Sequence, residues 1–119
     1  DTYAQFLVKK DVQFIEKIHQ VIEENLDNSD FNIDTIASTI GLSRSAFFKK
    51  LKSLTGFAPV DLVKEIRLNK SIELIKNSDM SISEIAFAVG FKDSGYFSKC
   101  FRKKYDQTPR EYMNEWRKG

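Results

Sequence analysis

The sequence predicts an all-α fold of seven helices. Three observations support this: apolar residues recur at three- and four-residue steps, short turns rich in Ser, Asp and Asn separate the periodic segments, and no strand-like alternation occurs. With only two Pro and five Gly among 119 residues, a loop-rich or disordered chain is disfavoured. An apolar fraction of 41%, including ten Phe, is enough for a compact core.

The first helix is expected after residues 1–10, which lack sustained periodicity and are interpreted as a linker or N-terminal extension. Asp11 is a suitable N-cap for a helix that begins at Val12 and ends near Leu26. The domain itself is therefore expected over residues 11–119.

A first pair of short helices is predicted over about 33–56. Asn32 or Asp34 caps the first of them, and Ser43 or Ser45 caps the second. Gly41 and Gly56 end the two helices, because glycine accepts the left-handed backbone that stops a helix. The apolar positions expected to face inward are Ile33, Ile36, Ala37, Ile40, Phe47, Leu51 and Leu54.

A long helix is predicted next, over about 59–76, with Pro59 at its start. A second pair of short helices follows over about 82–105, and a closing helix over about 109–117. The second pair is capped by Ser81 or Ser83 and by Asp93 or Ser94. Its inward positions include Ile82, Ile85, Ala86, Val89, Phe97, Cys100 and Phe101.

The two short pairs are copies of one unit. Six positions of the first helix and turn match at an offset of 49, from Ile33 to Leu42 and from Ile82 to Phe91. Beyond the turn the offset becomes 50, as Phe47 and Phe97 show, so the second turn holds one extra residue. A short helix, a tight turn at glycine and a second amphipathic helix are typical of a helix-turn-helix. The fold is thus two helix-turn-helix subdomains joined by a long linker helix.

The charge distribution favours a polyanionic partner. The net charge is +2, but residues 1–41 carry −5 and residues 42–119 carry +7. A solvated, mixed surface would give the same totals, so charge alone does not decide the partner.

Several classes of protein are disfavoured by composition. One Cys and one His exclude a disulfide within the chain and a cysteine or multi-histidine metal site, and no cofactor is expected. No nucleophile–base set or phosphate-binding glycine loop is visible, so we expect no enzyme. No signal peptide or membrane-spanning run occurs, which predicts a cytoplasmic protein without membrane contact. The Asp1 start suggests a fragment of a longer chain.

Residues 12–117 resemble the AraC/XylS family of DNA-binding domains. The resemblance is carried by EIRLNKSIELI (65–75), ISEIAFAVGF (82–91) and SGYFSKCFRKKYDQTPREY (94–112). Ser71 stands where the family usually has Ala, and Cys100 where it has a larger aliphatic residue. The segment FIEKIHQVIEENL further resembles C-terminal output domains of hybrid two-component regulators.

The resemblance implies which side chains contact base edges. In the first unit they match Ser45, Phe48 and Lys49; in the second they match Gly95, Tyr96, Ser98 and Lys99. Lys49 and Lys99 occupy the same place in the two copies, and a lysine there can donate to guanine O6 and N7. Phe48 either contacts a thymine methyl group or packs against the preceding helix, and Tyr96 either contacts DNA or is half-buried with its hydroxyl in water.

The remaining basic residues of the two second helices are better suited to phosphate, which fixes register and supplies salt-dependent affinity. The phosphate-contacting candidates are Arg44, Lys50, Lys52, Arg102, Lys103 and Lys104. A linker helix of 18 residues would be about 27 Å long. Two recognition helices about one DNA turn apart could then read successive major-groove segments of double-stranded DNA from one chain.

The function predicted is sequence-specific DNA binding as the output domain of a transcription regulator. We expect an upstream sensory or receiver domain of the same chain, with dimerisation through that part. The alternative is a helical protein-interaction module whose basic helices dock an acidic partner.

Overall fold

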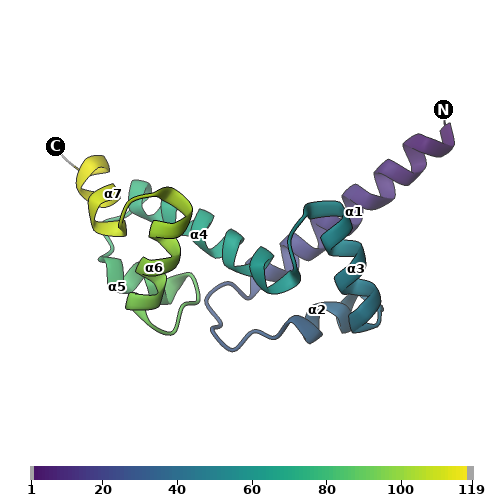
Figure 1. The fold of residues 1–119 in the computed structure, drawn as a ribbon, viewed down its shortest axis with the longest axis horizontal. Helices are drawn as coiled ribbons and strands as arrows, with labels where there is room; N and C mark the ends of the chain where they lie inside the picture. The colour runs from purple at the N-terminus through teal and green to yellow at the C-terminus, as the bar shows by residue number, and fades with distance from the viewer. Residues whose placement is uncertain (1, 118–119) are drawn as a thin grey trace. The chain divides into compact units, whose positions relative to one another are not determined.

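The computed structural model describes residues 2–117, and over these residues it contains seven α-helices and no strand (Figure 1). The all-α, seven-helix prediction is confirmed. The helices are α1 (Thr2–Glu24), α2 (Ile33–Ile40), α3 (Arg44–Thr55), α4 (Pro59–Asn77), α5 (Ile82–Ala88), α6 (Ser94–Tyr105) and α7 (Pro109–Trp116). None of these helices is both long enough and apolar enough to cross a membrane.

The helices form two compact units. The first contains the chain up to Asn25 and Phe31–Val63; the second contains Leu26–Asp30 and the chain from Lys64 onward. The long helix α4 contributes to both units, and each unit holds one repeated pair, α2–α3 or α5–α6. Leu26–Asp30, the middle of the loop between α1 and α2, therefore belongs to the second unit, although both flanking helices belong to the first.

Capping residues mark most of the helix boundaries. The N-caps are Asn32, Ser43, Ser81 and Asp93, each of which accepts a hydrogen bond from a backbone N–H in the first turn of its helix. The predicted end of α2 at a left-handed glycine is confirmed, since Gly41 has φ +81°.

Asp11 was expected to begin the first helix, and this prediction is wrong. Helix α1 starts at Thr2 and passes through Asp11 without interruption. The preceding residues contain no Gly or Pro and include good helix formers such as Ala4, Leu7 and Lys10. A residue suited to capping is also tolerated inside an exposed helix, so it need not mark a helix start.

The core of the first unit lies between α1, the α2–α3 pair and the start of α4. Phe14 and Phe47 meet at its centre, with ring centroids 6.4 Å apart in an edge-to-face arrangement. Other buried residues of this core include Ile18, Val21, Ile22, Ile36, Ala37, Leu51 and Val63. The prediction that Leu54 is buried is wrong, because this residue of the last turn of α3 is 39% exposed. The side chain of Ile33 lies outside the described residues.

The core of the second unit is built around α5 and α6. Its buried members are Leu68, Ile75, Ile85, Ala86, Val89, Phe91, Phe97 and Phe101, with Cys100 partly buried against them. Ser71 is also fully buried, and its hydroxyl donates to the carbonyl oxygen of Leu68 at 2.6 Å, within α4. This in-helix hydrogen bond satisfies the polar group where the family resemblance implies Ala.

Candidate nucleic-acid interface

The first candidate surface is the outer face of α3. Ser43 caps the helix by accepting from the amide of Ala46 at 3.1 Å, and Phe47 and Leu51 anchor the opposite face in the core. This anchoring leaves three predicted base-contacting residues exposed: Ser45, Phe48 and Lys49.

Phe48 faces solvent. Its side chain is 47% exposed and lines a shallow pocket together with Arg44, Ser45 and Lys49. Of the two interpretations of this ring, the exposure favours the one in which it is available to a ligand. An exposed ring with a neighbouring lysine suits the apolar and hydrogen-bonding groups of a base edge.

Three basic residues of α3 were predicted to contact phosphate, and the structure places them differently. Arg44 Nε lies 3.2 Å from Asp34 Oδ1 in an exposed ion pair. Lys50 Nζ lies 4.3 Å from the ring centroid of Phe14, so it points toward α1 in a cation–π contact. Lys52 is exposed in the last turn. All three residues are exposed, and Arg44 and Lys50 each have a partner within the first unit.

The second candidate surface is the outer face of α6. Asp93 caps this helix by accepting from the amide of Tyr96 at 2.8 Å, and Phe97 and Phe101 are fully buried. Gly95, Tyr96 and Lys99 are exposed and Ser98 is half-buried. A Cβ atom at position 95 would lie 3.0 Å from the cap oxygen of Asp93, so Gly95 gives the cap room.

Tyr96 is 53% exposed, and its ring lies 6.0 Å from that of the buried Phe91. The contact supports one side of the ring while the rest faces solvent. Such a side chain is amphipathic and held in place, which reduces the entropy lost when it meets a ligand.

The basic end of α6 divides into open and engaged residues. Arg102 and Lys103 are exposed. Lys104 is paired with Glu65 of α4, and its side chain is only 21% exposed. Partial burial lowers the pKa of Lys104. Because its ammonium has a carboxylate partner and its side chain is mostly buried, Lys104 is less accessible to a phosphate than the exposed Arg102 and Lys103.

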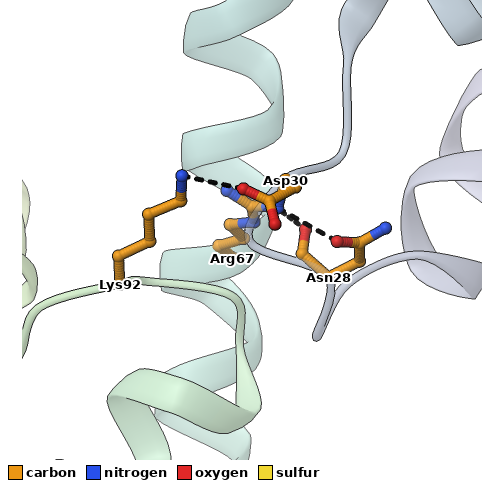
Figure 2. A network of polar contacts seen from close by, with 4 residues as sticks. All are labelled: Asn28, Asp30, Arg67 and Lys92. Atoms are coloured by element: carbon orange, nitrogen blue, oxygen red, sulfur yellow. Dashed lines mark hydrogen bonds and ion pairs between the residues drawn. The ribbon is translucent and has the colours of Figure 1, made fainter.

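A polar network in the second unit was not anticipated from the sequence (Figure 2). Lys92 Nζ lies 2.8 Å from Asp30 Oδ1, and Arg67 Nη2 donates to the carbonyl oxygen of Asn28 at 3.0 Å. The sequence contained one indication that Lys92 is unusual. Because the caps Ser43 and Asp93 correspond, Lys92 is the extra residue of the second turn.

Two units, each with a capped second helix anchored by two buried residues and basic on its outer face, define a DNA-binding protein of the helix-turn-helix class. A family model described as "Helix-turn-helix domain" matches residues 36–115, about two thirds of the chain. The chain belongs to this family, and its structural neighbours identify it as the AraC/XylS type.

The described residues hold no group of three or more His, Cys, Asp or Glu that could bind a metal.

Solved structures with this fold include a DNA complex. The DNA-binding domain of the global transcriptional factor AdpA, bound to a target DNA, is 28% identical, with a TM-score of 0.80 over 88% of this chain and 93% of that one. The C-terminal domain of the two-component response regulator yesN from Fusobacterium nucleatum is 31% identical. Its TM-score is 0.75, over 82% of this chain and 95% of that one.

Two curated relatives are much longer than the matched region. "Histidine kinase P4" of Formosa agariphila is 38% identical over 106 residues, which are 89% of this chain and 8% of the relative. "HTH-type transcriptional regulator MtrA" of Neisseria gonorrhoeae is 34% identical over 98 residues, which are 82% of this chain and 32% of the relative. The chain therefore spans a small part of each. Its family membership makes it a sequence-specific DNA-binding domain of transcription regulation.

Proposed function

We propose that this domain binds its operator with α3 and α6 in successive major-groove segments. The observation that carries the proposal is the recurrence of one exposed lysine, Lys49 and Lys99, on the outer face of the second helix in both units. Burial of Phe47 and Phe97 two positions earlier fixes the face that each lysine occupies. A helix-turn-helix uses this helix to reach base edges.

Base readout is assigned to the two lysines and the residues around them. In the first unit these are Ser45, Phe48 and Lys49; in the second they are Gly95, Tyr96, Ser98 and Lys99. Lysine donates to guanine O6 and N7, and the Phe48 ring suits a thymine methyl group. Gly95 would act by permitting close approach of the α6 backbone.

Phosphate contacts are assigned to basic residues at the margins of these surfaces. Lys52, Arg102 and Lys103 are exposed and carry this role most directly. Arg44 and Lys50 would exchange their present partners, Asp34 and the Phe14 ring, for phosphate. Exposed ion pairs are weak, so such exchange costs little.

The domain is proposed to act in the cytoplasm as the output part of a longer regulator. The support comes from relatives: one is described as a histidine kinase and one as the C-terminal domain of a response regulator. An upstream sensory or receiver domain would supply the signal, and dimerisation through that part would raise the effective concentration of the DNA-binding domain at paired sites.

A salt series of duplex binding tests the proposal. Wild type, Lys49→Ala, Lys99→Ala and the double variant would be titrated with duplex DNA, with Lys17→Ala of α1 as the control that removes one exposed charge elsewhere. Each recognition lysine is expected to contribute about 1–3 kcal/mol of base discrimination. No duplex binding at low salt, or a double variant that binds like the control, would contradict the proposal.

Selection from random duplexes tests the two-helix geometry. Two short motifs about 10 bp apart are expected, since successive major-groove segments on one face repeat at that spacing. Lys49→Ala should relax the preference in one motif and Lys99→Ala in the other. A single contiguous motif that both variants affect equally would argue against two-helix readout.

A further inference from the structure

The extra residue of the second turn, Lys92, has no counterpart in the first unit. Leu42 is followed directly by the cap Ser43, whereas Phe91 is separated from its cap Asp93 by Lys92. The insertion therefore places a cation immediately before the N-cap of α6. Both units close the same kind of turn, so closing the turn does not require the added residue.

Lys92 is held by a carboxylate from the loop between α1 and α2. Its Nζ lies 2.8 Å from Asp30 Oδ1, with the two side chains 68% and 81% exposed (Figure 2). The lysine lowers the pKa of Asp30, through its hydrogen bond first and its charge second. The two charges thus attract each other, but in an open position where water and salt weaken the pair.

The loop has other attachments that do not involve Lys92. Arg67 Nη2 donates to the carbonyl oxygen of Asn28, and Asn28 Oδ1 accepts from the amide of Asp30 at 3.0 Å. The loop backbone also lies against Gly90, because a Cβ there would be only 2.2 Å from the carbonyl oxygen of Leu26. The loop is therefore fixed by backbone contacts, and the ion pair can open without releasing it.

DNA offers Lys92 a second anionic partner. In a helix-turn-helix the N-terminal end of the second helix enters the major groove, whose edges are lined with phosphates. Lys92 lies next to that end of α6. The nearest acid along the chain, Asp93, is engaged as the cap of Tyr96. Asp30 therefore both occupies the Lys92 ammonium and adds a negative charge close to it.

We propose that Lys92 is a further phosphate-binding residue of the DNA interface and that Asp30 holds its ammonium until a DNA phosphate replaces the carboxylate. This rests on the proposed DNA-binding function. Exchange is feasible because exposed ion pairs of this kind change an equilibrium by no more than about fivefold. The second unit then carries a contact that the first unit lacks, at a small cost set by Asp30.

Three variants test the exchange: Lys92→Ala, Asp30→Asn and both together. They would be titrated over a salt series with the duplex recovered by selection and with a duplex of unrelated sequence. Lys92→Ala should weaken binding to both duplexes and reduce the slope of log affinity against log salt by about one. Asp30→Asn should raise affinity by up to about fivefold, since the lysine no longer has to leave a carboxylate. The gain from Asp30→Asn should be smaller when Lys92 is already alanine, because the ion pair couples the two residues.

The sign of the Asp30→Asn effect separates this proposal from a purely structural role. If the pair only positioned α6, Asp30→Asn would weaken binding. That result, or an unchanged salt slope for Lys92→Ala, would overturn the exchange. Lys17→Ala controls for the positive charge lost in Lys92→Ala, and circular dichroism checks that each variant folds. Wild-type binding is measured in the same series, so failure of the exchange is distinguishable from failure of DNA binding itself.

Discussion

Arg117 Nη1 donates a hydrogen bond of 2.7 Å to the carbonyl oxygen of Met80, in the segment between α4 and α5. The same guanidinium reaches the last turn of α4, where Nε donates to the carbonyl oxygen of Ile75 at 3.0 Å. Carbonyls at a helix C-terminus lack partners within the helix. Arg117, the residue that follows α7, thereby supplies a donor to the last turn of α4.

Arg117→Ala is expected to destabilise the second unit by about 2 kcal/mol, since it removes hydrogen bonds from a charged donor to the carbonyl oxygens of Ile75 and Met80. Arg117→Lys should lose less stability than Arg117→Ala but remain below wild type, because an ammonium cannot donate the same set of hydrogen bonds as a planar guanidinium. Urea unfolding followed by the fluorescence of Trp116, the single tryptophan, measures both. An alanine variant within about 0.5 kcal/mol of wild type would contradict the capping role.

Gly41 and Gly90 occupy matching positions but should respond differently to alanine. Both have positive φ, +81° and +96°, so each substitution carries backbone strain of about 1–2 kcal/mol. A Cβ at Gly41 meets no atom within 4 Å, whereas one at Gly90 would lie 2.2 Å from the carbonyl oxygen of Leu26. We expect Gly90→Ala to cost about 2 kcal/mol more than Gly41→Ala. Equal losses in thermal unfolding would show that the loop moves aside freely.

Ser71→Ala is expected to change stability by less than about 0.5 kcal/mol. The hydroxyl is fully buried, but its acceptor is the Leu68 carbonyl within the same helix, which α4 can satisfy through its backbone. Removing the hydroxyl therefore leaves no buried group without a partner. Urea midpoints of the two proteins provide the measurement, and a loss above about 1 kcal/mol would indicate a further role for the hydroxyl.

Tyr105 should make the second unit sensitive to alkaline pH. Burial, with a smaller contribution from Tyr112, raises the pKa of Tyr105 to about 12, and its hydroxyl donates to Asn69 Oδ1 at 3.0 Å. The folded-state pKa of Tyr105 lies above the ordinary value of 10.0, so the protonated hydroxyl favours the folded state. Its contribution to the free energy of unfolding is complete below pH 10 and is lost as pH rises toward 12.

The measurement is the free energy of unfolding between pH 9 and about 12, compared for wild type and Tyr105→Phe. Phe should flatten the dependence, although the lost hydrogen bond lowers stability at neutral pH. Tyrosinate absorbance of wild type and Tyr105→Phe gives an independent check, since the absorbance lost in the variant should be the part that develops near pH 12. Identical absorbance curves near pH 12 for the two proteins would contradict the raised pKa of Tyr105.

Features that depend on neighbouring residues in the chain were largely predictable. Asn32, Ser43, Ser81 and Asp93 cap helices through side chains that reach amides a few residues away, so the necessary chemistry is visible in a short window. The wrong prediction at Asp11 has a physical reason. The residues next to a carboxylate do not distinguish an N-cap from a position inside a helix.

Features that depend on distant residues were not predictable in the same way. In the sequence Lys104 looks like any other basic residue of α6, but in the structure it forms an ion pair with Glu65 of α4. Its neighbours Arg102 and Lys103 stay exposed, and nothing within the helix distinguishes the three. Phe48 illustrates the same point for the candidate site, because only the packed structure shows on which side of α3 its ring lies.

The exposed apolar residues in the first turns of α1 should affect the association of the purified domain in solution. Phe6, Leu7, Val8 and Val12 are between 45% and 63% exposed, on a helix that also carries the exposed ring of Tyr3. Apolar surface of this kind drives association that grows with protein concentration. A preparation that begins at residue 1 should therefore show sedimentation coefficients that rise on concentration, whereas one trimmed to residue 13 should stay closer to a single species. The trimmed form is the better choice for crystallisation trials and for calorimetry at high concentration.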